Sequence, residues 1–180
     1  MQYIQTAVFG GGCFWCTEAI FQRLKGVVSV TPGYSGGHIE NPTYDQVSGG
    51  ATGHAEAVKI DFDPKQISYR DLLNVFFSTH DPTAINRQGN DTGEQYRSVI
   101  FYTSPEQQRE VLEHIKELNK EQIFIRPIVT QIKPFAKFYP AEDYHKNYFN
   151  NNTDQPYCRI IIDPKISKLR AKFASLLAEE

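Results

Sequence analysis

The sequence contains little sulfur: among 180 residues there are three cysteines and one methionine. An odd and small number of cysteines argues against the disulfide framework of secreted proteins. Each thiol is therefore expected to be reactive or inert rather than part of a structural bridge.

A long apolar run is lacking as well, since no window approaches the roughly 20 apolar residues that a membrane span needs. We expect no association with a membrane.

Runs of basic residues are also missing. The chain has 19 basic and 21 acidic residues, a formal net charge of -2, and no cluster that would neutralise phosphates, which argues against nucleic acid as a partner. The N-terminal stretch "MQYIQTAVFGGG" has no basic leader followed by an apolar segment and a cleavage site, which favours a cytoplasmic protein. The length predicts a single domain over residues 1–180, and we expect it to be a monomer.

What the sequence does have is an alternation of strand and helix patterns. Strands are predicted at 2–9, from 27 to a break at Gly33, and at 54–62, 96–102 and 127–132. Helices are predicted from the turn at Gly10 to Gly12 as far as a stop at Gly26, at 68–80 behind the N-cap Ser68, at 104–118, and at 167–180, with a short helix or loop at 140–149. Two long polar loops, 38–53 and 81–95, are typical of functional segments. This order predicts an α+β fold of the ferredoxin-like split βαβ type, with a mixed sheet and helices packed on one side.

The stretch "FGGGCFWCTE", residues 9–18, carries the strongest chemical signal. Cys13 stands where a glycine turn enters a helix, and both a helix N-terminus and C-x-x-C spacing favour the thiolate that acts as a nucleophile. Three other interpretations stay open: inert buried thiols, a zinc site with Cys158, and a thioredoxin-like redox pair of Cys13 and Cys16. Zinc lacks a second paired ligand set, and thioredoxin-like proteins carry small residues or proline between their cysteines.

Phe14 and Trp15 fill the gap between the two cysteines. Aromatic residues at a helix start usually pack in the core. Beside a nucleophilic sulfur, however, a partly exposed aromatic pocket would suit a substrate that ends in a small soft group, such as a thioether or its sulfoxide. The motif therefore predicts recognition as well as attack.

Eight short motifs, in this order, resemble those of the A-type methionine sulfoxide reductases. They are "GGCFWCTE", "GYSGG", "NPTY", "GHAEAV", "HDPT", "RQGND", "QYRS" and "AEDYH". The resemblance runs from Gly11 to about Cys158 and is highly specific in combination. It implies reduction of the S epimer of methionine sulfoxide, free or in proteins, with thioredoxin as electron donor and without a metal or organic cofactor.

The resemblance also implies roles for individual residues. Cys13 matches the nucleophile, and Phe14 and Trp15 match the pocket that holds the methyl group of the substrate. The remaining matches surround the sulfoxide oxygen: the carboxylic acid Glu56, the hydroxyl donors Tyr44 and Tyr96, and Asp91, which helps to orient substrate and water. Since a sulfoxide becomes a good electrophile when its oxygen is protonated, Glu56 must start protonated, and an enclosed site would raise its pKa.

Taken singly, these residues have simpler interpretations. Glu56 in a strand could face solvent, Tyr44 and Tyr96 could be core tyrosines, and Asp91 could form a turn after Asn90. A metal site is a further alternative, for which the candidate ligands are His80, Asp81, Asp143 and His145.

Two cysteines compete to resolve the sulfenic acid that turnover leaves on Cys13. Cys158 matches the region where many family members hold their recycling cysteine, and we expect it on a flexible segment after "NNNTDQ". Cys16 stands where the commonest family pattern has glycine, and the glycine-rich, cysteine-bearing tail of some members is missing. Because a rigid helix start would resist closure, the sequence favours Cys158, with a relay through both thiols as an alternative. The alternative function is general thiol-disulfide exchange by Cys13 and Cys16.

Overall fold

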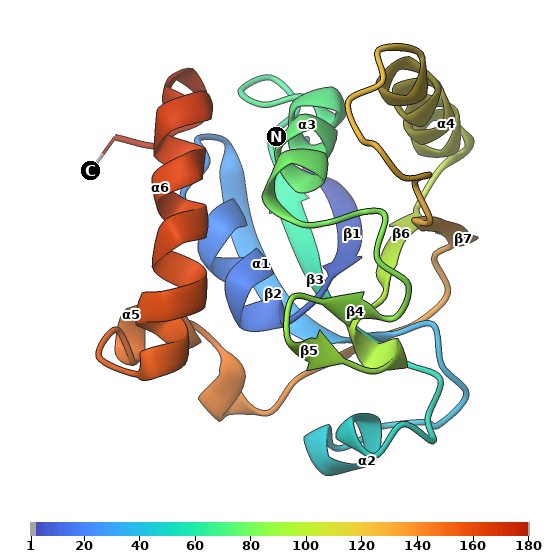
Figure 1. Cartoon of the computed structure of the whole chain (residues 1–180), viewed down its shortest axis with the longest axis vertical. Coiled ribbons are helices and arrows are strands. Elements are labelled where there is room, and N and C mark those ends of the chain that lie inside the picture. Colours follow the sequence, from blue (N-terminus) through green and yellow to red (C-terminus); the bar gives the residue numbers. More distant parts are fainter. Residues whose placement is uncertain (1–2, 180) are drawn as a thin grey trace.

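Six strands form one sheet in the computed structural model, which describes residues 3–179 (Figure 1). The strand order is β7 (Gln131–Pro134), β6 (Ser98–Tyr102), β1 (Gln5–Gly11), β3 (Ala55–Phe62), β2 (Val27–Ser35) and β8 (Phe138–Pro140). Neighbouring strands are antiparallel except β6 and β7, which are parallel. The expected α+β fold with a mixed sheet is therefore confirmed.

Helices and short segments connect these strands. The longer helices are α1 (Phe14–Phe21), α3 (Tyr69–Thr79), α4 (Pro105–Lys120) and α6 (Asp163–Lys172). The shorter elements are α2 (Tyr44–Ser48), α5 (Tyr148–Asn151), the two-residue strands β4 (Arg87–Gln88) and β5 (Asp91–Thr92), the 3-10 turns Glu94–Tyr96, Asp143–His145 and Ala174–Leu176, and the π-helical turn Cys158–Ile162. Within residues 3–179, the helices are too short or too polar to cross a membrane.

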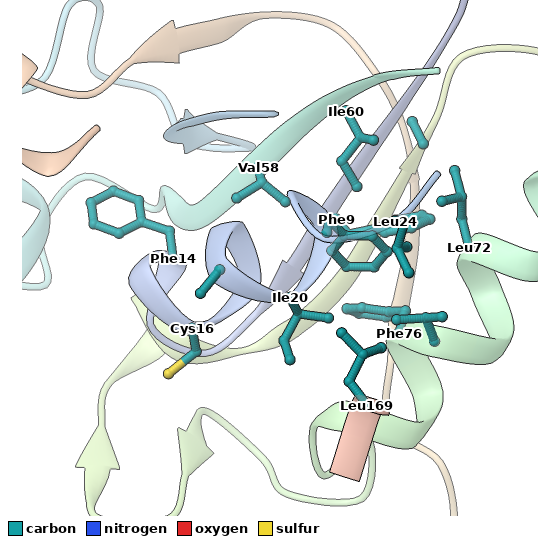
Figure 2. Packing of buried hydrophobic residues seen from close by; sticks show 14 of the residues in the cluster. Phe9, Phe14, Cys16, Ile20, Leu24, Val58, Ile60, Leu72, Phe76 and Leu169 are labelled. Carbon is teal, nitrogen blue, oxygen red and sulfur yellow. The ribbon is translucent and has the colours of Figure 1, made fainter. Parts of the chain in front are cut away.

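The two faces of the sheet are buried by different segments, because successive side chains of a strand point to opposite faces. Phe9 of β1 faces the main core, where it packs with residues of α1, α3 and α6 such as Ile20, Phe76 and Leu169 (Figure 2). Val8, the preceding residue, belongs to a smaller cluster on the other face. Phe135 and Phe138 cover that cluster, because the segment between β7 and β8 crosses from one edge of the sheet to the other.

The capped helices agree with the sequence prediction. Ser68 caps α3 in a reciprocal capping box with Asp71, and Ser104 caps α4 directly before Pro105. The loop expected at 38–53 contains α2, which starts with a capping box between Thr43 and Gln46. This T-x-x-Q signal was present in the sequence, so α2 could have been predicted.

Two expectations about the backbone are wrong. Gly10 and Gly11 do not form the turn but belong to β1, where an added Cβ would come within 2.8 Å of Val99 at Gly10 and within 2.8 Å of Phe76 at Gly11. Gly12, with a φ of +93°, makes the turn. Similarly, Gly33 does not break β2, because it lies in the strand where the backbone of Tyr139 in β8 approaches closely.

The C-terminal prediction is also wrong. The helix expected at 167–180 ends at Lys172 and begins at Asp163, directly after the turn Cys158–Ile162. Ile162, Ile166 and Leu169 recur at helical spacing and are buried, which explains why the helical region starts so early. Cys158 therefore does not lie on a flexible loop but opens a helical turn with its side chain fully buried.

Candidate active site

Cys13 lies at the start of α1, as the glycine-turn motif predicts. It is the N-cap residue, and its carbonyl oxygen accepts a hydrogen bond from the backbone N–H of Cys16 at 3.1 Å. The preceding Gly12 brings the chain from β1 into the helix against Gln88, and a Cβ there would lie 2.7 Å from the Gln88 Cγ. The local backbone thus fixes the nucleophile candidate between the sheet and the β4–β5 segment.

The protonation of the two thiols differs from the expectation. Burial raises the pKa of Cys13 well above its ordinary value, although a hydrogen bond from the N–H of Trp15 at the helix start lowers it in part. The hydrogen bond with Cys13 lowers the pKa of Cys16 to about 7, with further help from the Lys165 charge. The expectation that the helix start favours a thiolate on Cys13 is therefore wrong for Cys13 by itself, because burial outweighs the helix N–H group. Near neutral pH the negative charge belongs to the hydrogen-bonded pair.

Glu56 of β3 lies beside the first turn of α1. Its Oε1 accepts a hydrogen bond from the backbone N–H of Phe14 at 3.1 Å, and its side chain is 1 % exposed. Burial raises the pKa of Glu56 to about 8, so most of the carboxyl is protonated at pH 7. The burial of Glu56 favours the expected neutral acid, and the alternative of a solvent-facing strand residue is wrong.

Tyr44 and Tyr96 approach the same point from two different loops. Tyr44 opens α2 and Tyr96 closes the turn Glu94–Tyr96, and both side chains are half-buried. Burial raises the pKa of each hydroxyl, and the nearby charge of Glu56 raises it further. The charge of Cys13 raises the pKa of both hydroxyls as well. The structure therefore brings together the acid, the thiol and the two hydroxyl donors that the resemblance implies.

Asp91 lies in β5, on the side of the site that holds Cys16. Its Oδ2 accepts a hydrogen bond from the Tyr157 hydroxyl at 2.7 Å, and that hydroxyl lies 3.6 Å from the sulfur of Cys16. A groove of about 730 Å³ borders Cys13, Cys16, Asp91 and Tyr157. Asp91 is thus more than a turn former.

The aromatic pair of the motif consists of one fully buried residue and one partly exposed residue. Phe14 is 1 % exposed and packs against the rings of Tyr34 and His145. Trp15 is partly exposed, stacks on Tyr148 with ring centroids 3.7 Å apart, and donates from Nε1 to Nδ1 of His145 at 3.0 Å. Both rings border the start of α1 next to Cys13.

The segment after β8 supplies Glu142, which sequence reasoning missed, and His145, which it named only as a candidate metal ligand. Glu142 accepts hydrogen bonds from the hydroxyl of Tyr34 and from the backbone N–H of Tyr44, each at 3.0 Å. It thereby fixes the start of α2 to β2. His145 is fully buried and holds the indole of Trp15. The motif "AEDYH" contains both residues, but their partners lie about a hundred positions away, and so no local pattern indicates these contacts.

The candidate metal ligands do not come together. Within residues 3–179, no group of three His, Cys, Asp or Glu side chains is arranged to hold an ion. His80 instead contacts the carbonyl oxygen of Phe76 and the hydroxyl of Ser98, whereas His145 binds Trp15. Asp81 accepts from Thr83, and Asp143 pairs with Lys146.

Comparison with known proteins decides the family. A family model described as "Peptide methionine sulfoxide reductase" matches residues 5–177. The chain belongs to this family. A peptide methionine sulfoxide reductase MsrA of Deinococcus radiodurans is 56 % identical over 173 residues, which cover 96 % of this chain and 84 % of the relative. An MsrA of Saccharolobus solfataricus is 52 % identical over 170 residues, covering 94 % and 95 %.

Solved structures agree with this assignment. Reduced Mxr1 from Saccharomyces cerevisiae superimposes with a TM-score of 0.78 at 33 % identity, covering 86 % of this chain and 89 % of the other. Methionine sulfoxide reductase A of Corynebacterium diphtheriae gives a TM-score of 0.75 at 38 % identity, covering 83 % and 76 %. Mxr1 in complex with Trx2 matches with a TM-score of 0.55 at 26 % identity, covering 81 % and 84 %. The resemblance stated from the short motifs is confirmed.

Proposed function

We propose that this peptide methionine sulfoxide reductase reduces the S epimer of methionine sulfoxide, free or in proteins, with Cys13 as nucleophile and Glu56 as acid. One observation carries the proposal: a buried carboxyl with a pKa of about 8 lies at the first turn of the helix that Cys13 caps. A neutral acid and a thiol at one point are what sulfoxide reduction requires, because oxygen must gain a proton while sulfur is attacked.

The reaction then follows from the charges. The pair of Cys13 and Cys16 loses one proton, and the sulfur of Cys13 attacks the sulfur of the sulfoxide as a thiolate. Glu56 donates its proton to the sulfoxide oxygen. Methionine is released, and the oxygen remains as a sulfenic acid on Cys13, so the substrate gains two electrons and the thiol loses two. Tyr44 and Tyr96 donate hydrogen bonds to the charge that develops on oxygen.

Substrate binding is assigned to the remaining residues of the site. Trp15, held by His145 and Tyr148, offers an apolar ring to the methyl group, and the buried Phe14 supports the floor of that pocket. Asp91 orients the substrate and water from the Tyr157 side. A second thiol, from Cys16 or Cys158, condenses with the sulfenic acid to form a disulfide.

Thioredoxin returns the disulfide to two thiols. The complex of the related Mxr1 with Trx2 supports this donor. We also propose a cytoplasmic location, where dithiol reductants of this kind keep the three free cysteines reduced, and a single catalytic domain over residues 1–180.

The ferredoxin-like split βαβ plan is proposed for the core of the fold. Its support is the strand order β6-β1-β3-β2 with antiparallel neighbours, together with α1 between β1 and β2 and α3 between β3 and β6. In this plan α1 starts just after the end of β1, beside the start of the neighbouring strand β3, where Glu56 lies.

A single-turnover experiment tests the function. Reduced protein is mixed with an excess of the S epimer without a reductant, and methionine and remaining thiols are counted. We expect one methionine per chain and the loss of two thiols, whereas Cys13→Ser should form no methionine. Thiol exchange with a model disulfide, without methionine formation, would instead indicate a general oxidoreductase, the alternative that the C-x-x-C pair favours.

A further inference from the structure

Cys16 lies one helical turn from Cys13 before any reaction takes place. Phe14 and Trp15 between them are helical, and the interaction with the Cys13 thiol lowers the pKa of Cys16. An α-helical turn separates the Cα atoms of residues three apart by about 5 Å, from its 1.5 Å rise and 2.3 Å radius. A disulfide needs a Cα separation of roughly 4.4–6.8 Å, so the helix start already has the spacing for a bond between Cys13 and Cys16.

The surroundings of Cys16 also favour its action as a nucleophile. The hydroxyl of Tyr157 lies 3.6 Å from its sulfur, and the charge of Lys165 lowers the pKa of the thiol together with the bond to Cys13. Figure 2 shows that the sulfur of Cys16 leaves α1 in a different direction from Phe14. It borders the groove that Tyr157 and Lys165 line.

Cys158 lies in a less favourable position. Its side chain is 0 % exposed, belongs to the main core and opens the helical turn that continues into α6. Burial raises the pKa of its thiol, so it is protonated near neutral pH. Attack by Cys158 would require this turn to unwind and the thiol to ionise. The flexible segment that favoured Cys158 on sequence grounds is a helical turn in the structure.

We propose that Cys16, rather than Cys158, resolves the sulfenic acid and forms a disulfide with Cys13. The inference rests on the proposed function. The Cys16 thiolate attacks the sulfur of the Cys13 sulfenic acid, an S–S bond forms, the S–O bond breaks, and the oxygen leaves as hydroxide, which becomes water with one proton.

The same geometry sets the direction of the next exchange. Cys13 is partly exposed and Cys16 is buried, so a thiolate of the reducing dithiol attacks Cys13, and Cys16 leaves as a thiolate. A thiol of lower pKa leaves faster, which suits Cys16. The second thiol of the dithiol then displaces Cys13, which leaves the reductant oxidised and both protein thiols reduced.

Peptide mass spectrometry after one turnover tests this pairing, because trypsin places the candidates in different peptides. Residues 1–23 contain Cys13 and Cys16, and residues 147–159 contain Cys158. We expect the peptide 1–23 to be lighter by two hydrogens and the peptide 147–159 to keep its free thiol. A cross-link between the two peptides in the wild-type protein would overturn the inference.

Two matched variants separate the candidates. Cys158→Ser should still release one methionine and lose two thiols. Cys16→Ser should also release one methionine at completion, although more slowly because Cys13 loses its thiol partner, which shows that the site is folded. Its Cys13 sulfenic acid should persist and be trapped by dimedone in the peptide 1–23. A persistent sulfenic acid in Cys158→Ser, with normal resolution in Cys16→Ser, would refute the assignment. Absence of methionine from the wild-type protein would instead overturn the proposed function.

Discussion

The clearest quantitative prediction concerns Glu56→Gln. Glutamine keeps the shape of the side chain and an oxygen that accepts the hydrogen bond from the Phe14 N–H, but it removes the titrating proton. Burial raises the pKa of Glu56 from 4.5 to about 8, so the folded protein holds a proton that the unfolded chain loses in this pH window. Wild-type stability must therefore fall as the pH rises from about 4.5 to about 8, whereas the variant lacks this contribution.

The size of the effect follows from the two pKa values. With 1.36 kcal/mol for each pKa unit, the buried Glu56 lowers the free energy of unfolding by about 1 kcal/mol near pH 5.5 and by about 3 kcal/mol near pH 7, because the carboxyl ionises in the unfolded chain but stays mostly protonated in the folded protein. The stability of Glu56→Gln relative to wild type should therefore increase by about 2 kcal/mol between these pH values. General acid catalysis contributes about 100-fold or more, so the same variant should lose at least that factor in the rate of methionine release.

Urea unfolding of both proteins near pH 5.5 and pH 7 measures the difference, and a single-turnover rate measures the loss of the acid. Glu113→Gln on the exposed face of α4 is the matched control, because it removes a carboxyl group that is not buried. A stability difference between Glu56→Gln and wild type that stays constant with pH would refute the raised pKa. An unchanged rate of methionine release would refute the acid role.

Two further predictions concern backbone packing and the aromatic pocket. Gly10→Ala should destabilise the protein by about 1–3 kcal/mol in urea unfolding, because the new Cβ would lie 2.8 Å from Val99 Cγ1 and 3.0 Å from the backbone oxygen of Glu56. Unchanged stability would show that β1 can shift away. Trp15→Phe removes the hydrogen bond to His145, worth about 1 kcal/mol, and should raise the KM for the sulfoxide by up to about tenfold with a smaller change in kcat. A loss confined to kcat would contradict a binding role.

The features that could be predicted, such as the helix caps and the position of Cys13, depend on residues that are neighbours in the sequence. Ser68 and Ser104 precede apolar helical patterns, and both cap helices as expected. Cys13 follows glycines and precedes a helix, so its position at the helix start followed from the sequence. The raised pKa of Glu56 was predictable for a different reason, because the chemistry implied by the resemblance requires a neutral acid.

The parts that could not be predicted depend on contacts between distant segments. Gly10 is flexible in isolation, but the approach of Val99 and the backbone of Glu56 makes it a strand residue. The polar stretch before Cys158 indicates a loop, yet burial of Ile162 and Leu169 extends the helical region back to the cysteine. Tertiary packing thus overrides local preference at both positions.

The path of residues 131–140 links the edges of the sheet to the site. One short segment pairs with β6 through β7 and with β2 through β8, so it covers backbone groups on both sides of the four central strands. Short edge strands that end in proline, as β7 and β8 do, protect a sheet from aggregation through its open edges. The chain leaves β8 directly into Glu142 and His145, the residues that hold Tyr44 and Trp15. A molecule that loses β8 therefore loses its binding pocket together with its protection from self-association.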